Sequence, residues 1–174
     1  MNKFAKFVID HNYTGNNNYV FKSCQIKWII ILQKLNDTIT NENRNDIYDI
    51  ETASFRANKL KVICIVNKFN PKININKIIN SIYTKKNITY TVNEIVCVDD
   101  YDMDINNIYS SGIHYYKSLD PAFYSELDLY KKYIGNFFSY HNNGRIEVNG
   151  FIINGNFFGE RKYYDDCGFH IMNG

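Results

Sequence analysis

Apolar residues in this chain occur only in short runs, and no run is longer than five residues. A membrane-spanning helix needs about 18 or more consecutive apolar residues, so the sequence predicts none. Residues 25–32 are the most apolar segment, and such a continuous run is typical of a strand buried on both faces. The first residues reach Asp10 and His11 before any long apolar region forms, so no signal peptide is expected.

Polar connectors separate the apolar runs of the first 100 residues, which favours strands over helices there. The predicted strands cover residues 4–9, 25–32, 60–66 and 88–98. One segment differs, because Ile75, Ile78, Ile79 and Ile82 recur at helical spacing. Residues 74–83 are therefore predicted to form a short amphipathic helix.

A strand and a second helix are expected after the acidic loop at residues 99–104. Residues 112–116 read Gly-Ile-His-Tyr-Tyr and predict a short strand that opens at a glycine. Asp120 and Pro121 then supply an N-cap acceptor and a first-turn proline. The helix they start carries one apolar stripe: Phe123, Leu127, Tyr130 and Ile134.

Glycines crowd into the last forty residues, where seven of the nine lie. Compared with itself at an offset of 24, this tail aligns five residues: Gly135, Tyr140, Gly144, Asn149 and Gly150 match Gly159, Tyr164, Gly168, Asn173 and Gly174. Tight turns are expected at Gly144, Gly155 and Gly168, because glycine adopts positive φ easily. The tail is therefore predicted to be a repeat of β-hairpins.

These elements together predict an α+β fold with a mixed or mostly antiparallel sheet and two short helices. Residues 1–132 would form the α+β domain. Residues 133–174 would form a small antiparallel β-meander that packs on it, because two hairpins alone bury little surface.

Charge and cysteine spacing exclude several function classes. The net charge is only +2, whereas a dedicated nucleic-acid binder carries a larger basic excess, so nucleic acid is not an expected partner. The cysteines at 24, 64, 97 and 167 form no CxxC pair, and no metal site is predicted from them. The acidic loop resembles half of an EF-hand but lacks its glycine and its final glutamate, which favours a solvated loop. No cofactor is predicted.

The tail resembles the variant MORN repeat found in bacterial and giant-virus proteins. The matching residues in its second unit are Gly155, Gly159, Glu160, Tyr163, Tyr164 and Gly168. The first unit keeps Gly135, Tyr140 and Gly144 but departs elsewhere. The resemblance implies a chain of β-hairpins.

The upstream region resembles an uncharacterised domain of mimivirus-like giant viruses. The resemblance rests on residues 55–62 and 88–92, on the GIHYY segment at 112–116, and on Ala122 and Tyr124. The cysteines of that domain are replaced here, one by Phe55 and the other at the position of Ser110 or Ser111, so a thiol or metal role does not carry over. The abundance of Asn, Ile, Lys and Tyr agrees with an AT-rich viral genome. The resemblance implies a protein of the host-cell cytoplasm or the virion.

Two function hypotheses follow. The favoured one is a non-enzymatic protein-binding or structural module, which binds a protein partner or another copy of itself through the aromatic tail. Its candidate binding residues are Arg56, His114, Tyr116, Phe157, Phe158, Tyr163 and Tyr164.

The alternative is an NAD-binding enzyme, because the GIHYY strand and the helix after it also resemble ADP-ribosyltransferase folds. On that resemblance Arg56 or His114 would hold NAD, and Tyr115 or Tyr116 would stack on nicotinamide. Glu126 would polarise the ribose. The Ser-Thr-Ser strand and the Glu-x-Glu pair of those enzymes are absent, which favours structural roles for His114 and the tyrosines.

Overall fold

Antiparallel strands make up most of the computed structural model, which describes residues 3–13, 15, 17–80 and 87–174. Strands contain 41% of the residues and helices 10%. The predicted α+β class is therefore wrong, and the protein is a mostly β protein. Among the described residues, no helix has the length and apolar character needed to cross a bilayer.

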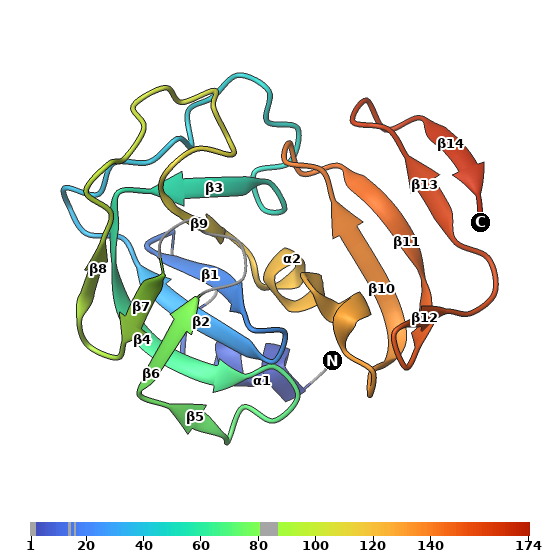
Figure 1. Cartoon of the computed structure of the whole chain (residues 1–174), viewed down its shortest axis with the longest axis horizontal. Coiled ribbons are helices and arrows are strands. Elements are labelled where there is room, and N and C mark those ends of the chain that lie inside the picture. Colours follow the sequence, from blue (N-terminus) through green and yellow to red (C-terminus); the bar gives the residue numbers. More distant parts are fainter. Residues whose placement is uncertain (1–2, 14, 16, 81–86) are drawn as a thin grey trace.

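The main sheet has seven strands in the order β3-β9-β1-β2-β4-β5, and β8 also pairs with β4 (Figure 1). Every pairing in it is antiparallel. The strands are β1 (Tyr19–Cys24), β2 (Trp28–Gln33), β3 (Ser54–Ala57), β4 (Lys59–Asn67), β5 (Asn74–Ile75), β8 (Ile95–Cys97) and β9 (Ile113–Tyr116). The predicted strands at 25–32, 60–66 and 112–116 are confirmed as β2, β4 and β9.

The helix predicted at residues 74–83 is wrong within the described part of the segment, and residues 81–83 lie outside it. β6 (Lys77–Asn80) pairs instead with β7 (Ile88–Thr91). Burial alternates along β6, because Ile78 and Asn80 point inward while Lys77 and Ile79 are exposed. Ile75, Ile78 and Ile79, in the described part of the segment, also favour strands, because β-branched side chains pack well on a sheet.

The opposite error occurs at the N-terminus, where the strand predicted at residues 4–9 is the helix α1 (Lys3–Asp10). Phe4 and Val8, four residues apart, are its buried side chains. A spacing of four places both on one helix face, against the sheet.

Apolar side chains cover the main sheet on both faces and form two cores. The first core lies on the side of the β6–β7 hairpin and includes Val20, Ile30, Leu32, Ile78 and Tyr90. The second core lies under α1, α2 (Leu119–Tyr124) and the C-terminal sheet. Phe21, Ile29, Ile31, Phe123, Phe137 and Ile152 belong to it.

The helix predicted near Asp120 is confirmed, but its N-cap is Ser118 rather than Asp120, and the helix is shorter than its apolar stripe suggests. α2 ends at Tyr124, and a single 3-10 turn, η1 (Leu127–Leu129), follows. Between them Glu126 has φ 63°, a left-handed conformation that a continuous helix excludes. Leu127 and Tyr130 still reach the second core, from η1 and the residue after it, whereas Ile134 begins β10 and is 62% exposed.

The tail forms a separate five-stranded antiparallel sheet beside α2 (Figure 1). Its strands are β10 (Ile134–Tyr140), β11 (Ile146–Ile153), β12 (Asn156–Phe157), β13 (Lys162–Tyr164) and β14 (His170–Asn173). Gly144, Gly155 and Gly168 have φ of 93°, 80° and 87°, as predicted for the turns.

The expectation of two MORN-like hairpins in this tail is not upheld. β10 and β11 are seven and eight residues long, and both reach the second core. β13 and β14 have only three and four residues, and β14 is exposed throughout. The two units therefore differ in length and in burial. The division into domains at residue 132 stays a prediction.

Arg56 holds the loop between β8 and β9. Its side chain is fully buried, and its guanidinium donates to the backbone carbonyls of Asp102 at 2.6 Å, Asn107 at 2.8 Å and Ser111 at 3.2 Å, and also to that of Asp104. The Tyr101 ring lies 4.9 Å from the guanidinium carbon. The loop that the sequence suggested as solvated is thus fixed from beneath by one buried cation.

Replacing Arg56 should destabilise the protein. In Arg56→Met the four carbonyls lose a charged donor, and such hydrogen bonds contribute about 1.5–3 kcal/mol each. We expect a loss of about 3 kcal/mol or more in the free energy of unfolding, with faster amide hydrogen exchange across residues 100–111. Urea unfolding and exchange measured by mass spectrometry test this. Lys77→Met, on the exposed side of β6, is the control and should change little.

The C-terminal sheet should contribute to stability through Phe137. This side chain is 7% exposed in the second core, whereas Phe158, which directly follows β12, is 66% exposed. Phe137→Ala should cost about 3–5 kcal/mol, because it removes a buried ring, and Phe158→Ala about 0.5 kcal/mol or less. Equal effects of the two substitutions on the urea midpoint would show that the sheet does not share the core.

Candidate functional site

A cavity of about 370 Å³ lies where α2 meets the C-terminal sheet. Figure 1 shows α2 between the main sheet and β10. The cavity brings together four residues that the sequence analysis named in different hypotheses: Tyr116, Glu126, Phe157 and Tyr163. Its volume falls within the range of natural ligand pockets.

Strand register places several aromatic rings of the C-terminal sheet on the face that lines the cavity. Phe137 pairs with Gly150, Phe157 with Ile152, and Tyr163 with Val148, so the members of each pair share a face. The Phe137 and Phe157 rings meet edge to face, with centroids 5.4 Å apart. Gly150 makes room for them, because a Cβ there would lie 3.0 Å from the Phe157 ring.

The main domain supplies the opposite wall. Tyr116 comes from the end of β9 and Tyr124 from the last turn of α2. Tyr124 also meets Phe138 edge to face at 5.2 Å. Burial, with Asp120 nearby, raises the pKa of Tyr124, and the same causes raise that of Tyr140 to about 12. Both phenols therefore stay neutral at physiological pH.

Three carboxylates line the cavity: Glu126, Asp128 and Glu147. The described lining contains no lysine, arginine or histidine. Immediately beside it, the Arg161 guanidinium carbon lies 4.9 Å from the Phe157 ring centre and 5.1 Å from that of Tyr163. The site therefore combines electron-rich ring faces with negative charge.

Glu126 is held in place by the β1–β2 turn. Its Oε2 accepts a hydrogen bond from the backbone N–H of Ile26 at 2.8 Å and a longer one from Ser23 Oγ at 3.3 Å. The left-handed backbone at Glu126 turns its side chain away from the line of α2 and toward β1. Its carboxylate thus lies at the boundary between the main sheet and the cavity.

The remaining residues of the NAD hypothesis lie outside this cavity, but His114 and Tyr115 line a second cavity of about 1380 Å³ together with Tyr116 and Glu126. Tyr115 is 1% exposed, and its hydroxyl donates to Glu42 Oε1 at 2.6 Å. His114 is half-buried, with Nε2 at 3.1 Å from the carbonyl oxygen of Ser110. Burial and the nearby Lys22 lower the pKa of His114, so its ring is neutral at physiological pH. Arg56 is occupied by the 99–111 loop.

Two candidate binding residues of the tail lie away from the cavity. Phe158 is exposed beside β12. Tyr164 pairs with His170, with ring centroids 5.7 Å apart, and its carbonyl oxygen lies 2.8 Å from His141 Nε2. Binding roles for both residues stay predictions.

Sequence reasoning missed a buried polar cluster under the β1–β2 turn. Lys68 is 2% exposed, and its Nζ donates to Ser23 Oγ at 2.8 Å and to the Ser125 carbonyl at 2.7 Å. Burial lowers the pKa of Lys68 to about 7, although the charge of Glu126 opposes the shift. No local pattern could have indicated this cluster, because its members are 45 or more residues apart and a lysine after a strand is usually solvated.

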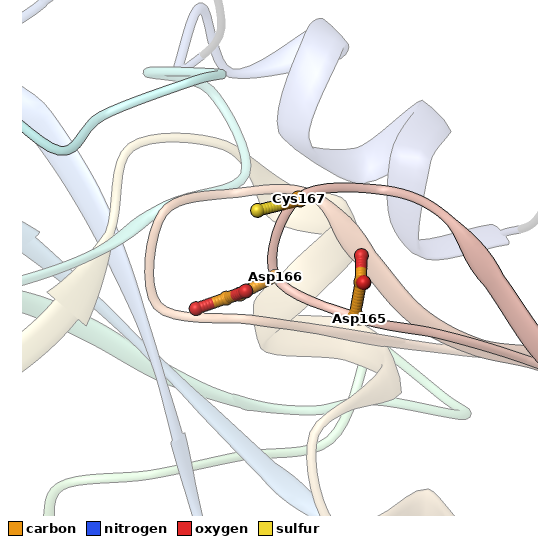
Figure 2. Close-up of side chains that lie close together, drawn as sticks. All are labelled: Asp165, Asp166 and Cys167. Carbon is orange, nitrogen blue, oxygen red and sulfur yellow. The ribbon is translucent and has the colours of Figure 1, made fainter.

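Figure 2 shows the single group among the described residues whose side chains could share a metal ion, Asp165, Asp166 and Cys167 in the β13–β14 turn. Their ligand atoms lie within 4.8 Å of one another. Arg145 reaches into the same turn and donates to the Cys167 carbonyl. Asp166 raises the pKa of the Cys167 thiol, which disfavours the thiolate that binds metal. We assign no metal to this exposed turn.

Comparison with known proteins identifies one family. No curated protein and no solved structure matches the chain. Residues 10–122 match the model of a family of unknown function, DUF5758. This region includes the GIHYY strand and the start of α2, which agrees with the expected uncharacterised domain. Since the match covers more than half of the sequence, the chain belongs to the family of unknown function DUF5758.

Proposed function

We propose that the protein is a binding module that receives an arginine side chain of a partner protein in the cavity between α2 and the C-terminal sheet. The observation that carries the proposal is the lining, in which aromatic rings surround three carboxylates. A cation over such rings gains about 0.5–2 kcal/mol, and the carboxylates add charge attraction. This function requires no catalytic step.

A guanidinium suits the site better than an ammonium. It is planar, so it can stack on a ring while its N–H groups donate in a fork to a carboxylate. Arg161 already stacks in this way against Phe157 and Tyr163 at the margin of the cavity. The same arrangement is open to a second guanidinium on the Tyr116, Tyr124 and Phe137 side.

The partner is a different protein rather than a second copy of this chain. The sequence contains four arginines, and each has an intramolecular role. Arg44 is 4% exposed and donates to the Ser54 carbonyl at 2.6 Å, and Arg56 is fully buried. Arg145 lies 3.6 Å from the Tyr48 ring centre, and Arg161 stacks as described. A second copy would have to break one of these contacts.

Exposed apolar side chains of the C-terminal sheet provide further contact area for the chain that bears the arginine. Ile134, Phe158, Phe169 and Ile171 are each more than half exposed. β14 lies at an edge of its sheet, where another strand can pair.

A giant-virus origin, and a location in the host cell or the virion, stay predictions that rest on composition and on the GIHYY resemblance. The NAD-binding alternative stays a prediction. His114, Tyr115, Tyr116 and Glu126 all line a larger cavity of about 1380 Å³. Tyr115 is only 1% exposed there, so stacking on nicotinamide would fall to Tyr116.

Binding of a small arginine ligand tests the proposal. N-acetyl-arginine-methylamide should shift the NMR signals of Tyr116, Tyr124 and Tyr163, with a dissociation constant on the order of 1–10 mM. The citrulline analogue, which has the same shape but no charge, should not. The double variant Asp128→Asn, Glu147→Gln removes two charges from exposed side chains and should weaken binding about three- to tenfold.

The matched control is Glu160→Gln, which neutralises a carboxylate of the same sheet outside the cavity. It should leave the affinity unchanged. Equal binding of the citrulline analogue, or equal weakening by the control, would rule out the charged cavity as the site.

A further inference from the structure

We propose that Ser23 is a nucleophile and Lys68 its general base, and that together they transfer the acyl group of a small carboxylic ester to water. This inference does not require arginine binding, although Tyr116 and Glu126 line both cavities. It rests on the buried cluster under the β1–β2 turn and on the larger cavity that opens beside it.

The two side chains are in hydrogen-bond contact, with 2.8 Å between Lys68 Nζ and Ser23 Oγ. Lys68 is anchored from its other side, because Nζ donates to the Ser125 carbonyl at 2.7 Å. A neutral amine can keep that donation and direct its lone pair at Ser23 Oγ. The Ser23 hydroxyl, which here donates to Glu126 Oε2 at 3.3 Å or to the Ser125 carbonyl at 3.4 Å, then rotates to donate to Lys68 Nζ. The geometry therefore meets the first requirement of nucleophile activation, a base within hydrogen-bond reach.

The protonation state of Lys68 suits the same role. Burial lowers its pKa to about 7, so a large share of the molecules carry the free amine at neutral pH. An exposed lysine, with a pKa near 10.4, would be almost fully charged and unable to accept a proton. A general base works best when its pKa lies near the working pH.

Ser23 and Lys68 differ in their exposure to the larger cavity. Ser23 is half-buried and lines a cavity of about 1380 Å³, together with Lys22, His114, Tyr116 and Glu126. Lys68 is 2% exposed and does not line it. A substrate in the cavity therefore meets the hydroxyl first, and the amine lies directly behind it, 2.8 Å from Oγ.

The chemistry balances with these groups and water. As Ser23 Oγ attacks the ester carbonyl, its proton passes to Lys68 Nζ, and the acyl carbon bonds to Oγ. The bond to the alkoxide leaving group breaks, and Lys68 returns the proton to that group, which leaves as an alcohol. Water then attacks the acyl-serine and gives a proton to Lys68. The acid departs, and Ser23 Oγ regains its proton.

Glu126 and Ser125 stabilise the charge that forms during these steps. Proton transfer makes Lys68 an ammonium in a buried place, which is costly without partners. The Ser125 carbonyl accepts from it, and the negative charge of Glu126 lies close enough to favour the protonated form. Glu126 thus acts as a positioning residue in the same way as the third member of a catalytic triad.

Active-site labelling of the full chain tests the assignment. Incubation with p-nitrophenyl acetate, and separately with a fluorophosphonate probe, should give one adduct per chain, which peptide mass mapping places on Ser23. The labelling rate should rise with pH through about 7, as Lys68 loses its proton. Surface lysines that p-nitrophenyl acetate modifies are separated from Ser23 by the mapping.

Two substitutions distinguish a base from a structural lysine. Lys68→Arg keeps a donor for Ser125 but stays protonated, so labelling of Ser23 should fall about 10²- to 10⁴-fold while the circular dichroism spectrum is unchanged. Ser23→Ala should remove the adduct, whereas Ser139→Ala, a half-buried serine of the C-terminal sheet, should not. An unlabelled Ser23 in the wild-type protein overturns the proposal. So does labelling of Ser23 that is unchanged in Lys68→Arg or independent of pH between 6 and 8.

Discussion

Burial of β2 on both faces is the constraint on which the rest of the structure depends. Residues 29–32 are isoleucines and a leucine with no exposed surface. Alternate side chains point to opposite faces of a strand, so each face of the main sheet needs a cover. The β6–β7 hairpin covers one face, and α1, α2 and part of the C-terminal sheet cover the other. The cavity beside α2 lies within this second cover, which explains why residues more than 40 positions apart meet there.

Three buried cationic side chains of this fold are stabilised in the same way, by hydrogen bonds to backbone carbonyl oxygens. Arg56, Lys68 and Lys22 are each at least nine-tenths buried, and each donates to backbone carbonyl oxygens. Backbone carbonyls are fixed by the fold and carry no full charge, so they satisfy the donors without neutralising the cation completely. For Arg56 the result is a fixed loop. For Lys68 the weak compensation leaves a lowered pKa, and a hydroxyl lies within reach of its Nζ.

Sequence patterns correctly predicted those elements whose formation depends on residues close together in the chain. The strand at 112–116, a helix near Asp120 and the glycine turns of the tail all depend on neighbouring residues, and all are present. The errors occurred where two periods fit the same residues: Phe4 and Val8 fit a helix as well as a strand, and the isoleucines of 75–82 fit both. Contacts such as Ser23 with Lys68 are set by strand order, which no local pattern encodes.

The two proposed sites divide along the family boundary. The DUF5758 match ends at residue 122, so it includes Ser23, Lys68 and Tyr116. Glu126, Phe137, Glu147, Phe157 and Tyr163 all follow that boundary. The arginine cavity is therefore built mostly from the segment after the matched region, whereas the serine and the lysine lie wholly within that region. Tyr116, Ser125, Glu126 and Asp128 line both cavities. The Glu126 carboxylate also accepts hydrogen bonds from Ile26 and Ser23. A ligand that draws the Glu126 carboxylate toward the cavity would remove negative charge from beside Lys68. Occupancy of the tail's site would then lower the pKa of the lysine in the family domain.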